Sequence, residues 1–434
     1  MSDIKAHSIR LDTLAELRVS QWRPRQELLA GQRERLRELL IHAGKHSPYY
    51  RQLFAQAGFN PATGTLEQFA SLPLLDKHTV RNRLDDLLME GADKAQLGLH
   101  KTGGSTGQSL TVYFDKRWEE RRNADAMRSD EWAGWRLGMQ VGAVWGNPPV
   151  PASWYERFKS RWLYCMDLYL DTMNMSPQTM DAFAAQWRER GVDVLFGHAH
   201  SLYILADYLR TRGDHGIYPV GIIATSMMLL ENERAVIEKV FGCPVTNRYG
   251  CEEVALIACE CERHRGMHLN IEHLYIEFLN DRLEPAQPGE TAEIVVTDLY
   301  NRAMPLIRYR VGDMGAYSER VCECGRGWPM LEQVIGRTAD FLKRKDGSQV
   351  AGVSLVERTL TAIPGLAQMQ LVQTALDCIE VNLVPGDDFT EATIEQLQAE
   401  FKLVFGADLR LNVHRLEQIP REASGKYRFA KCLV

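Results

Sequence analysis

Thr102-Gly103-Gly104-Ser105-Thr106-Gly107 is the most informative stretch of the chain, and a strand-like apolar run at 110–114 follows it. Glycine lets backbone N–H groups approach a phosphate closely, and the three hydroxyl groups add further donors. No Gly-Lys-Ser/Thr sequence completes it, so the stretch is not a Walker A loop. Taken alone, it is equally consistent with a flexible turn.

The bulk composition describes a globular protein of several domains. A chain of 434 residues is too long for one compact core, so two or three domains are expected. Its net charge of -6 gives no support for a nucleic-acid partner. The number of cysteines, nine, is odd, which argues against a disulfide framework and for reduced thiols.

Neither a membrane segment nor a secretion signal is expected from the sequence. No apolar run reaches the roughly 18 residues that a membrane-spanning helix needs. Residues 1–7 lack the apolar region of a signal peptide. The expectation is therefore a cytoplasmic protein without a membrane partner.

Between about 140 and 250 the sequence alternates apolar runs with helical periodicity. Strands separated by helices of this length are typical of a mainly parallel sheet with helical crossovers. The expected strands are 141–145, 192–196 and 221–224, and the expected helices are 179–190, 201–211 and 231–240.

The flanking regions have other patterns. Residues 12–57 are expected to be helical, and the charge-rich run 117–122 is expected to form a solvated helix face. Strands dominate 270–335, and a small unit of alternating strands and helices follows Gly336. The pattern therefore predicts an α/β protein with a boundary near residue 335.

Tyr249-Gly250-Cys251-Glu252-Glu253 is a second candidate segment, because it follows an expected strand at 245–248. A carboxylate at the carboxyl end of a strand is well placed to hold Mg²⁺ beside a phosphate. A solvated acidic turn is the alternative reading.

Three more segments carry candidate ligands. Asp313 ends the run 305–313 and could accept hydrogen bonds from ribose hydroxyls, or simply belong to a turn with Gly312. Arg337 lies in 336–343, at the expected boundary. Lys426 stands beside Gly425 near the end of the chain, where it could reach an anion or form a frayed basic tail.

These five segments, in this order, resemble the adenylate-forming superfamily of acyl-CoA synthetases and nonribosomal adenylation domains. The resemblance is strongest to the phenylacetate–CoA ligase branch, which has counterparts of 46–51, 58–59 and 72–77. It covers nearly the whole chain. It implies a large N-terminal domain at 1–335, with mainly parallel sheets and helical crossovers, and a small mobile α+β domain at 336–434.

The resemblance also implies roles for single residues. The loop Thr102, Gly103, Gly104, Ser105, Thr106 and Gly107 would cradle the β- and γ-phosphates of ATP. Tyr249, next to Gly250, would lie against the adenine, and Glu253 would bind Mg²⁺. Asp313 would bind the ribose hydroxyls, Arg337 the ribose or phosphate, and Lys426 the substrate carboxylate and α-phosphate.

Two positions depart from the family pattern. Glu252 stands where the family usually has Ser or Thr, so the usual hydroxyl contact with the nucleotide is in doubt. The family's hinge position falls on Ala339, and Asp340 is the polar neighbour that could share its role. A rotation of the small domain between two half-reactions does not require a polar hinge.

Cysteines cluster at 259–261 and 322–324. Paired soft ligands on two turns suit tetrahedral Zn²⁺, and some members of this branch look similar there. The preferred ligands are Cys261, His264, Cys322 and Cys324, with His268 and Cys259 as alternates. Four protein ligands would make the site structural. Partly buried free thiols are the alternative.

The resemblance implies a ligase that activates a carboxylic acid with ATP and Mg²⁺ and passes the acyl group to coenzyme A, and for this branch it implies an aromatic acid. An adenylating ligase that uses an amine, a hydroxyl or a carrier-protein thiol as acceptor remains an alternative. So do a nucleotide-binding scaffold without catalysis and a metal-binding interaction protein. A homodimer is left open.

Overall fold

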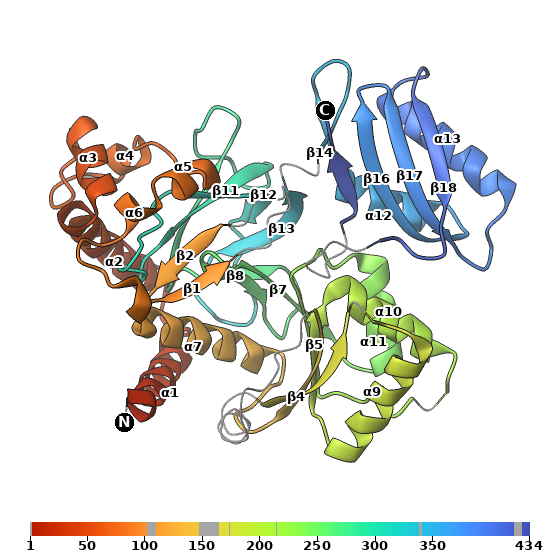
Figure 1. The fold of residues 1–434 in the computed structure, drawn as a ribbon, viewed down its shortest axis with the longest axis horizontal. Helices are drawn as coiled ribbons and strands as arrows, with labels where there is room; N and C mark the ends of the chain where they lie inside the picture. The colour runs from red at the N-terminus through yellow and green to blue at the C-terminus, as the bar shows by residue number, and fades with distance from the viewer. Residues whose placement is uncertain are drawn as a thin grey trace. The chain divides into compact units, whose positions relative to one another are not determined.

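Two units, each with its own strands and helices, make up the chain (Figure 1). The computed structural model describes residues 2–101, 110–146, 165–172, 174–213, 215–337, 341–420 and 428–434. The first unit comprises Met1–Gly134, Thr246–Val311 and Gly315–Gln333. The second comprises Trp135–Val245, Gly312–Met314 and Val334–Val434.

The first unit opens with helices and closes with strands. Its helices are α1 (Ser2–Ser20), α2 (Arg25–His46), α3 (Pro48–Gln56), α4 (Leu66–Ala70), α5 (Lys77–Asn82), α6 (Leu84–Leu87), the short 3₁₀ helix η1 (Lys94–Gln96) and α7 (Lys116–Trp132). Its strands are β1 (Gly98–Lys101), β2 (Thr111–Phe114), β7 (Val245–Cys251), β8 (Ala255–Glu260), β9 (Met267–Leu269), β10 (Leu274–Leu279), β11 (Ala292–Asp298), β12 (Tyr309–Ser318) and β13 (Met330–Arg337), the last two reaching into the second unit.

The helical region expected at 12–57 is divided into α1, α2 and α3. Pro24 precedes α2 with an extended backbone, ψ 145°. Ser47, at φ −101° and ψ 122°, precedes Pro48, which is the first residue of α3. A residue before proline is disfavoured in the α region, and proline is tolerated in the first helical turn, so both breaks follow from the prolines.

The strands of the first unit pair mainly antiparallel, in the order β10-β11-β12-β13-β9-β8-β7. Strand β10 pairs antiparallel with β11, β13 with β9, β9 with β8 and β8 with β7. β1 and β2 form a separate antiparallel hairpin, with Gly98 opposite Phe114. The turn after β7 carries Glu252 and Glu253, and the turn after β8 carries Cys261. Both turns therefore connect strands of the same sheet.

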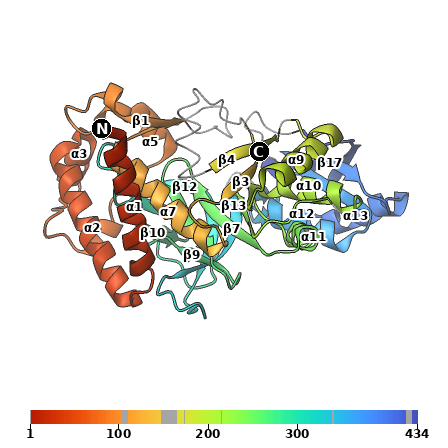
Figure 2. The ribbon, with the colours of Figure 1, turned by 90° about the horizontal axis from the view of Figure 1, so that it is seen from below.

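Helix α7 lies against α1, as both ribbon views show (Figures 1 and 2). Asp115 caps its first turn by accepting a hydrogen bond from Trp118 N at 2.8 Å. The solvated charged face expected at 117–122 includes the exposed Arg117 but not Glu120, which is buried, and further along the helix Asp125 and Arg128 are buried as well. Buried charges are stable only when they are paired, and α7 therefore depends on partners from the sheet.

A buried network supplies these partners. Arg128 donates to Glu272 Oε2 at 2.9 Å and to Asn270 Oδ1 at 3.2 Å. His273 Nδ1 lies 2.6 Å from Asp125 Oδ2, and its Nε2 lies 3.4 Å from Asp298 Oδ1. Burial alone would lower the pKa of His273, but the carboxylates of Asp298 and Asp125 outweigh it and raise the pKa to about 9.

The raised pKa of His273 predicts a pH-dependent stability. A histidine with a folded-state pKa above its unfolded value of 6.5 stabilises the fold fully below pH 6.5, and this contribution is lost as the pH rises through about 9. The free energy of unfolding should fall by about 3 kcal/mol over this interval. Urea titrations at several pH values measure it. In His273→Gln the free energy of unfolding should change little over the same pH interval. A pH dependence as steep as in the wild type would contradict the assignment.

The second unit contains the predicted parallel sheet, with strand order β6-β5-β3-β4. The pairs of β3 with β4, β3 with β5 and β5 with β6 are parallel. Its first elements are β3 (Gln140–Trp145), β4 (Cys165–Asp171), α9 (Pro177–Arg190), β5 (Val194–His198), α10 (Ala199–Arg210), β6 (Gly221–Thr225) and α11 (Glu231–Phe241).

These helices begin and end where the sequence indicates. Ser176 caps α9 by accepting from Thr179 N, and Gly191 ends it in the left-handed conformation at φ 63°. The apolar faces of α9, α10 and α11 pack with the strands into one core, which includes Phe183, Leu205 and Ile237. The mixed α/β fold predicted from the sequence is confirmed.

The C-terminal part of the second unit is a small α+β module. Its elements are β14 (Phe341–Lys343), β15 (Gln349–Ala351), α12 (Gly352–Ala362), β16 (Leu366–Ala375), β17 (Cys378–Pro385), α13 (Glu391–Phe405), β18 (Arg410–Arg415) and β19 (Ala430–Cys432). The strand order is β18-β17-β16-β19. Alternate residues such as Leu371 and Val381 pack against Phe401 of α13 in a single core. The small unit of alternating strands and helices expected after Gly336 is present.

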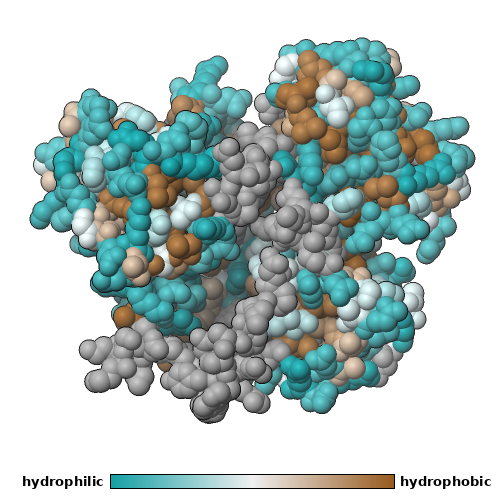
Figure 3. All heavy atoms as spheres, in the orientation of Figure 1, coloured by the Kyte–Doolittle hydropathy of each residue, from teal (hydrophilic) through white to brown (hydrophobic). Residues whose placement is uncertain are grey.

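On the face of the molecule shown in Figure 3, hydrophilic side chains predominate and hydrophobic ones are interspersed among them. Among the described residues, no helix is both long and apolar enough to cross a membrane.

Candidate functional site

The structure describes only some of the predicted site residues. Thr102 to Gly107 and Lys426 lie outside the described residues, as does Ala339. Arg337 is the last residue of β13. The nucleotide roles of these residues therefore stay predictions.

The turn between β7 and β8 carries Glu252 and Glu253. A Cβ atom on Gly250 would stand 2.4 Å from the backbone oxygen of Ala255, so glycine is required where the two strands approach. Ala255 itself has φ 66°, and the pairing of β7 with β8 shifts its register between Tyr249 and Gly250. This irregular hairpin fixes the direction in which the two carboxylates leave the sheet.

Glu253 is buried, with 4 % of its surface exposed. Tyr309 donates its hydroxyl hydrogen to Glu253 Oε1 at 3.1 Å, and Lys77 Nζ lies 3.6 Å from the same oxygen. One carboxylate oxygen of Glu253 therefore has a hydroxyl donor and an ammonium group beside it. Mg²⁺ is commonly held by one or two carboxylates together with substrate phosphates, so a single fixed carboxylate fits this ion.

Glu252 has a different environment. Its side chain is half exposed and pairs with Arg122 Nη2 at 3.1 Å. His100 Nδ1 lies 3.4 Å from the same Glu252 oxygen, and Arg122 Nη1 contacts His100 Nε2. The charge of this unusual carboxylate is thus neutralised by Arg122 of α7, through a contact between residues far apart in sequence that the motif itself does not reveal.

Asp313 lies within β12, directly after Gly312, which has φ 84°. The sequence placed Asp313 at the end of a strand, whereas the strand continues to Ser318. A glycine with positive φ is typical of a local irregularity inside a strand. Asp313 therefore follows a glycine that makes the backbone of β12 irregular at this point.

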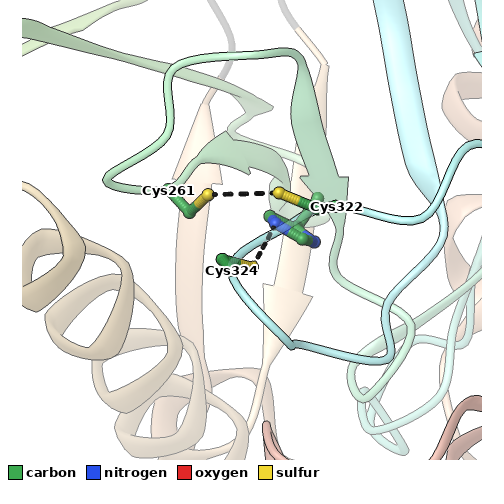
Figure 4. A group of neighbouring side chains, drawn as sticks. Cys261, Cys322 and Cys324 are labelled. Atoms are coloured by element: carbon green, nitrogen blue, oxygen red, sulfur yellow. Dashed lines mark hydrogen bonds between the residues drawn. The ribbon is translucent and has the colours of Figure 1, made fainter.

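Cys261, His268, Cys322 and Cys324 form a cluster in the first unit (Figure 4). Their ligand atoms all lie within 4.8 Å of one another. Cys261 Sγ is 3.7 Å from Cys322 Sγ, and Cys324 Sγ is 3.3 Å from His268 Nε2. Tetrahedral Zn²⁺ with Zn–S bonds of about 2.3 Å would place two sulfur atoms about 3.8 Å apart, so the donors present fit this ion.

The histidine of this cluster is His268, the alternate, and not the preferred His264. His264 has φ 48°, and its Nδ1 lies 3.4 Å from Glu260 Oε2. His268 stands in β9, where it is buried and lies opposite Cys259 of β8 on one side and Met330 of β13 on the other. Burial lowers the pKa of His268 to about 4, so its imidazole is neutral. Neutral imidazole is the form that binds metals.

Cys259, the other alternate, is not part of the cluster either. It is buried, and its Sγ lies 3.3 Å from the backbone oxygen of Glu260. Burial also raises the pKa of this thiol. Cys259 thus has the environment of a structural free thiol.

Arg326 joins the two cysteine-bearing turns. Its Nη1 donates to Glu262 at 2.8 Å, and its backbone N donates to Cys324 Sγ at 3.4 Å. The guanidinium also lies 4.5 Å from the rings of both Trp22 and Trp132. Such supporting contacts orient the residues that bind a metal.

Comparison with known proteins finds similar sequences and a similar fold over nearly the whole chain. The family model for the CapK C-terminal domain matches residues 342–432. The chain is 25% identical over 419 residues to protein CapK of Staphylococcus aureus. The aligned region covers 95% of this chain and 91% of that protein. The chain is also 25% identical to the phenylacetate-coenzyme A ligase of Thermus thermophilus, over 93% of this chain and 96% of the other.

A solved structure of 2-hydroxyisobutyryl-CoA ligase in the postadenylation state has the same fold. The TM-score is 0.71 at 19% sequence identity, over 91% of this chain and 87% of the other. Together these likenesses confirm the resemblance that the sequence motifs indicated.

Proposed function

The chain is a relative of the phenylacetate–CoA ligase branch of the adenylate-forming superfamily, and we propose that it joins a carboxylic acid to coenzyme A at the expense of ATP. The acid would first attack the α-phosphate, which releases pyrophosphate and leaves an acyl-adenylate. The thiol of coenzyme A would then displace AMP. The observation that supports this best is the similarity to ligases over nearly the whole chain, and the buried carboxylate of Glu253 lies in a segment that resembles a motif of this family.

The reaction brings two anions together, so it depends on positive charge and little on acid–base chemistry. Mg²⁺, when bound, would offset the charge of the phosphates. Glu253 would hold this ion, with Tyr309 fixing one carboxylate oxygen. The loop 102–107 would bind the β- and γ-phosphates, and Tyr249 would lie against the adenine. Asp313 would bind the ribose hydroxyls, and Arg337 would bind the ribose or phosphate. Lys426 would bind the reacting carboxylate and the α-phosphate.

An aromatic acid is the substrate class that we propose, and this rests on the similarity to phenylacetate-coenzyme A ligases alone. A pyrophosphate-release screen over aromatic, heteroaromatic and aliphatic acids tests it. Turnover limited to aliphatic acids would reject the aromatic class and leave the ligase reaction standing.

We propose a structural Zn²⁺ ion at Cys261, His268, Cys322 and Cys324. Four protein ligands leave no open position for a substrate, so the ion would stabilise the first unit and take no part in the reaction. The turns that it would join are 61 residues apart in sequence between Cys261 and Cys322.

Asp313→Ala is expected to raise the ATP concentration that half-maximal activity requires. Hydrogen bonds to a charged group contribute roughly 1.5–3 kcal/mol each, so the requirement should rise about 10-fold or more. Initial rates against ATP concentration measure the effect, and the exposed Asp346 offers a control as Asp346→Ala. An unchanged ATP requirement in Asp313→Ala would reject the ribose-binding role.

A further inference from the structure

Arg122, Glu252 and His100 form a closed triad on the first unit. Arg122 donates through Nη2 to Glu252 Oε2 at 3.1 Å and through Nη1 to His100 Nε2. His100 Nδ1 lies 3.4 Å from the same Glu252 oxygen. Because Nε2 accepts a hydrogen bond from a guanidinium, His100 is neutral in this arrangement and its Nδ1 carries the hydrogen.

An aromatic platform holds the triad in place. The ring of His100 stacks on Phe114 at 4.5 Å, and Phe114 lies 4.8 Å from Trp118. Trp118 is anchored by a 2.6 Å hydrogen bond from its Nε1 to Asp298 Oδ2. The guanidinium carbon of Arg122 lies 5.6 Å from the Trp118 ring. The position of Arg122 is therefore fixed by a buried support and by two polar partners.

Two members of the triad are close in sequence to segments to which the proposed function gives phosphate chemistry. His100 belongs to β1, and the glycine-rich stretch starts two residues later in the sequence. Glu252 adjoins Glu253, the proposed Mg²⁺ ligand. The Arg122 side chain keeps 22% of its surface exposed and Glu252 keeps 50%, so the ion pair can be reached from solvent.

We propose that Arg122 binds the terminal phosphates of the nucleotide, and that Glu252 and His100 hold its guanidinium for this contact. The inference rests on the proposed function and adds a residue to it. Planar guanidinium groups bind phosphate oxygens through two hydrogen bonds. Position 252, where the family usually has a hydroxyl that could meet the nucleotide directly, then acts in this chain through an arginine.

The pairing of Glu252 with Arg122 also explains why a carboxylate is tolerated beside phosphates. A free Glu252 would repel the nucleotide, whereas a Glu252 paired with Arg122 adds no net charge. When phosphate oxygens approach, they can share the guanidinium that Glu252 orients. Glu252 is then a positioning residue, and Arg122 is the one that touches the substrate.

The test is nucleotide binding by the full chain, measured calorimetrically with Mg²⁺ and either α,β-methylene ATP or AMP. Arg122→Gln should weaken binding of the ATP analogue by about 10- to 100-fold, since one charge-assisted contact is lost, and change AMP binding less than about 2-fold. Arg117→Gln, an exposed arginine of the same helix, is the matched control and should leave both affinities unchanged.

Two further variants separate this role from damage to the fold. Arg122→Lys keeps the charge without the planar fork, and its loss should be intermediate between the wild type and Arg122→Gln. Glu252→Gln keeps an oxygen that can accept a hydrogen bond from the guanidinium, so its loss of affinity for the ATP analogue should be smaller than that of Arg122→Gln. A loss in Glu252→Gln as large as that in Arg122→Gln would show that binding needs the carboxylate charge itself and would overturn the assignment.

Other outcomes are equally decisive. Equal losses for the analogue and AMP in Arg122→Gln, or no loss for either, would overturn the inference and leave the proposed function standing. A wild-type chain that binds neither nucleotide would overturn the proposed function, and the inference with it.

Discussion

Lys426→Ala is expected to lower the rate of acyl-adenylate formation by about 100- to 1,000-fold, the usual effect of removing one group that stabilises the charge of a transition state. The lysine would bind the substrate carboxylate and the α-phosphate as they approach. Acid-dependent exchange of labelled pyrophosphate into ATP measures this half-reaction directly.

The second half-reaction supplies the contrast. Thioester formation from a preformed acyl-adenylate should be largely spared in Lys426→Ala, because no new phosphate contact forms in that step. Lys402→Ala, at an exposed lysine of α13, is the control and should leave both rates unchanged. Equal losses in the two half-reactions would show that Lys426 does not have the proposed role.

Loss of a zinc ligand is expected to have the largest effect on stability. The protein should carry about one zinc per chain after desalting, as elemental analysis would measure. Cys322→Ser and His268→Ala should remove the metal and destabilise the first unit by at least about 2 kcal/mol, which lowers the melting temperature by roughly 4–8 °C.

The two alternates are the matched controls for this experiment. Cys259→Ser and His264→Ala should keep the full zinc content, since neither side chain belongs to the cluster. Zinc loss in His264→Ala and retention in His268→Ala would reverse the ligand assignment. A metal-free protein with full stability would remove the zinc site altogether.

Most elements of the second unit could be predicted from the sequence because their signals are local, whereas β4 of its parallel sheet was not expected. Gly191 ends α9 where the helical period ends, and the strands of the parallel sheet are short apolar runs between such helices. The helix breaks at Pro24 and Ser47 also have local causes, because each follows from a proline. The sequence around them is otherwise typical of helix, and one continuous helical region was expected there.

The features that the sequence did not reveal depend on contacts between distant segments. His264 stands three residues from Cys261, as in many metal-binding turns, but the pairing of β9 with β8 and β13 puts His268 beside the cysteines instead. Likewise, 117–122 has the composition of a solvated helix face, and only the folded chain places Arg122 against Glu252. Spacing along the chain does not encode such pairings.

The central claim is that the chain makes an acyl-adenylate and passes the acyl group to a thiol. Incubating the protein with ATP, Mg²⁺, a panel of carboxylic acids and coenzyme A, with mass spectrometry of the products, tests it most directly. The expected products are AMP, pyrophosphate and an acyl-CoA thioester for at least one aromatic acid. An acyl-adenylate that accumulates and yields product only with an amine, a hydroxyl or a carrier-protein thiol would contradict the acceptor, and the absence of any pyrophosphate would contradict the claim as a whole.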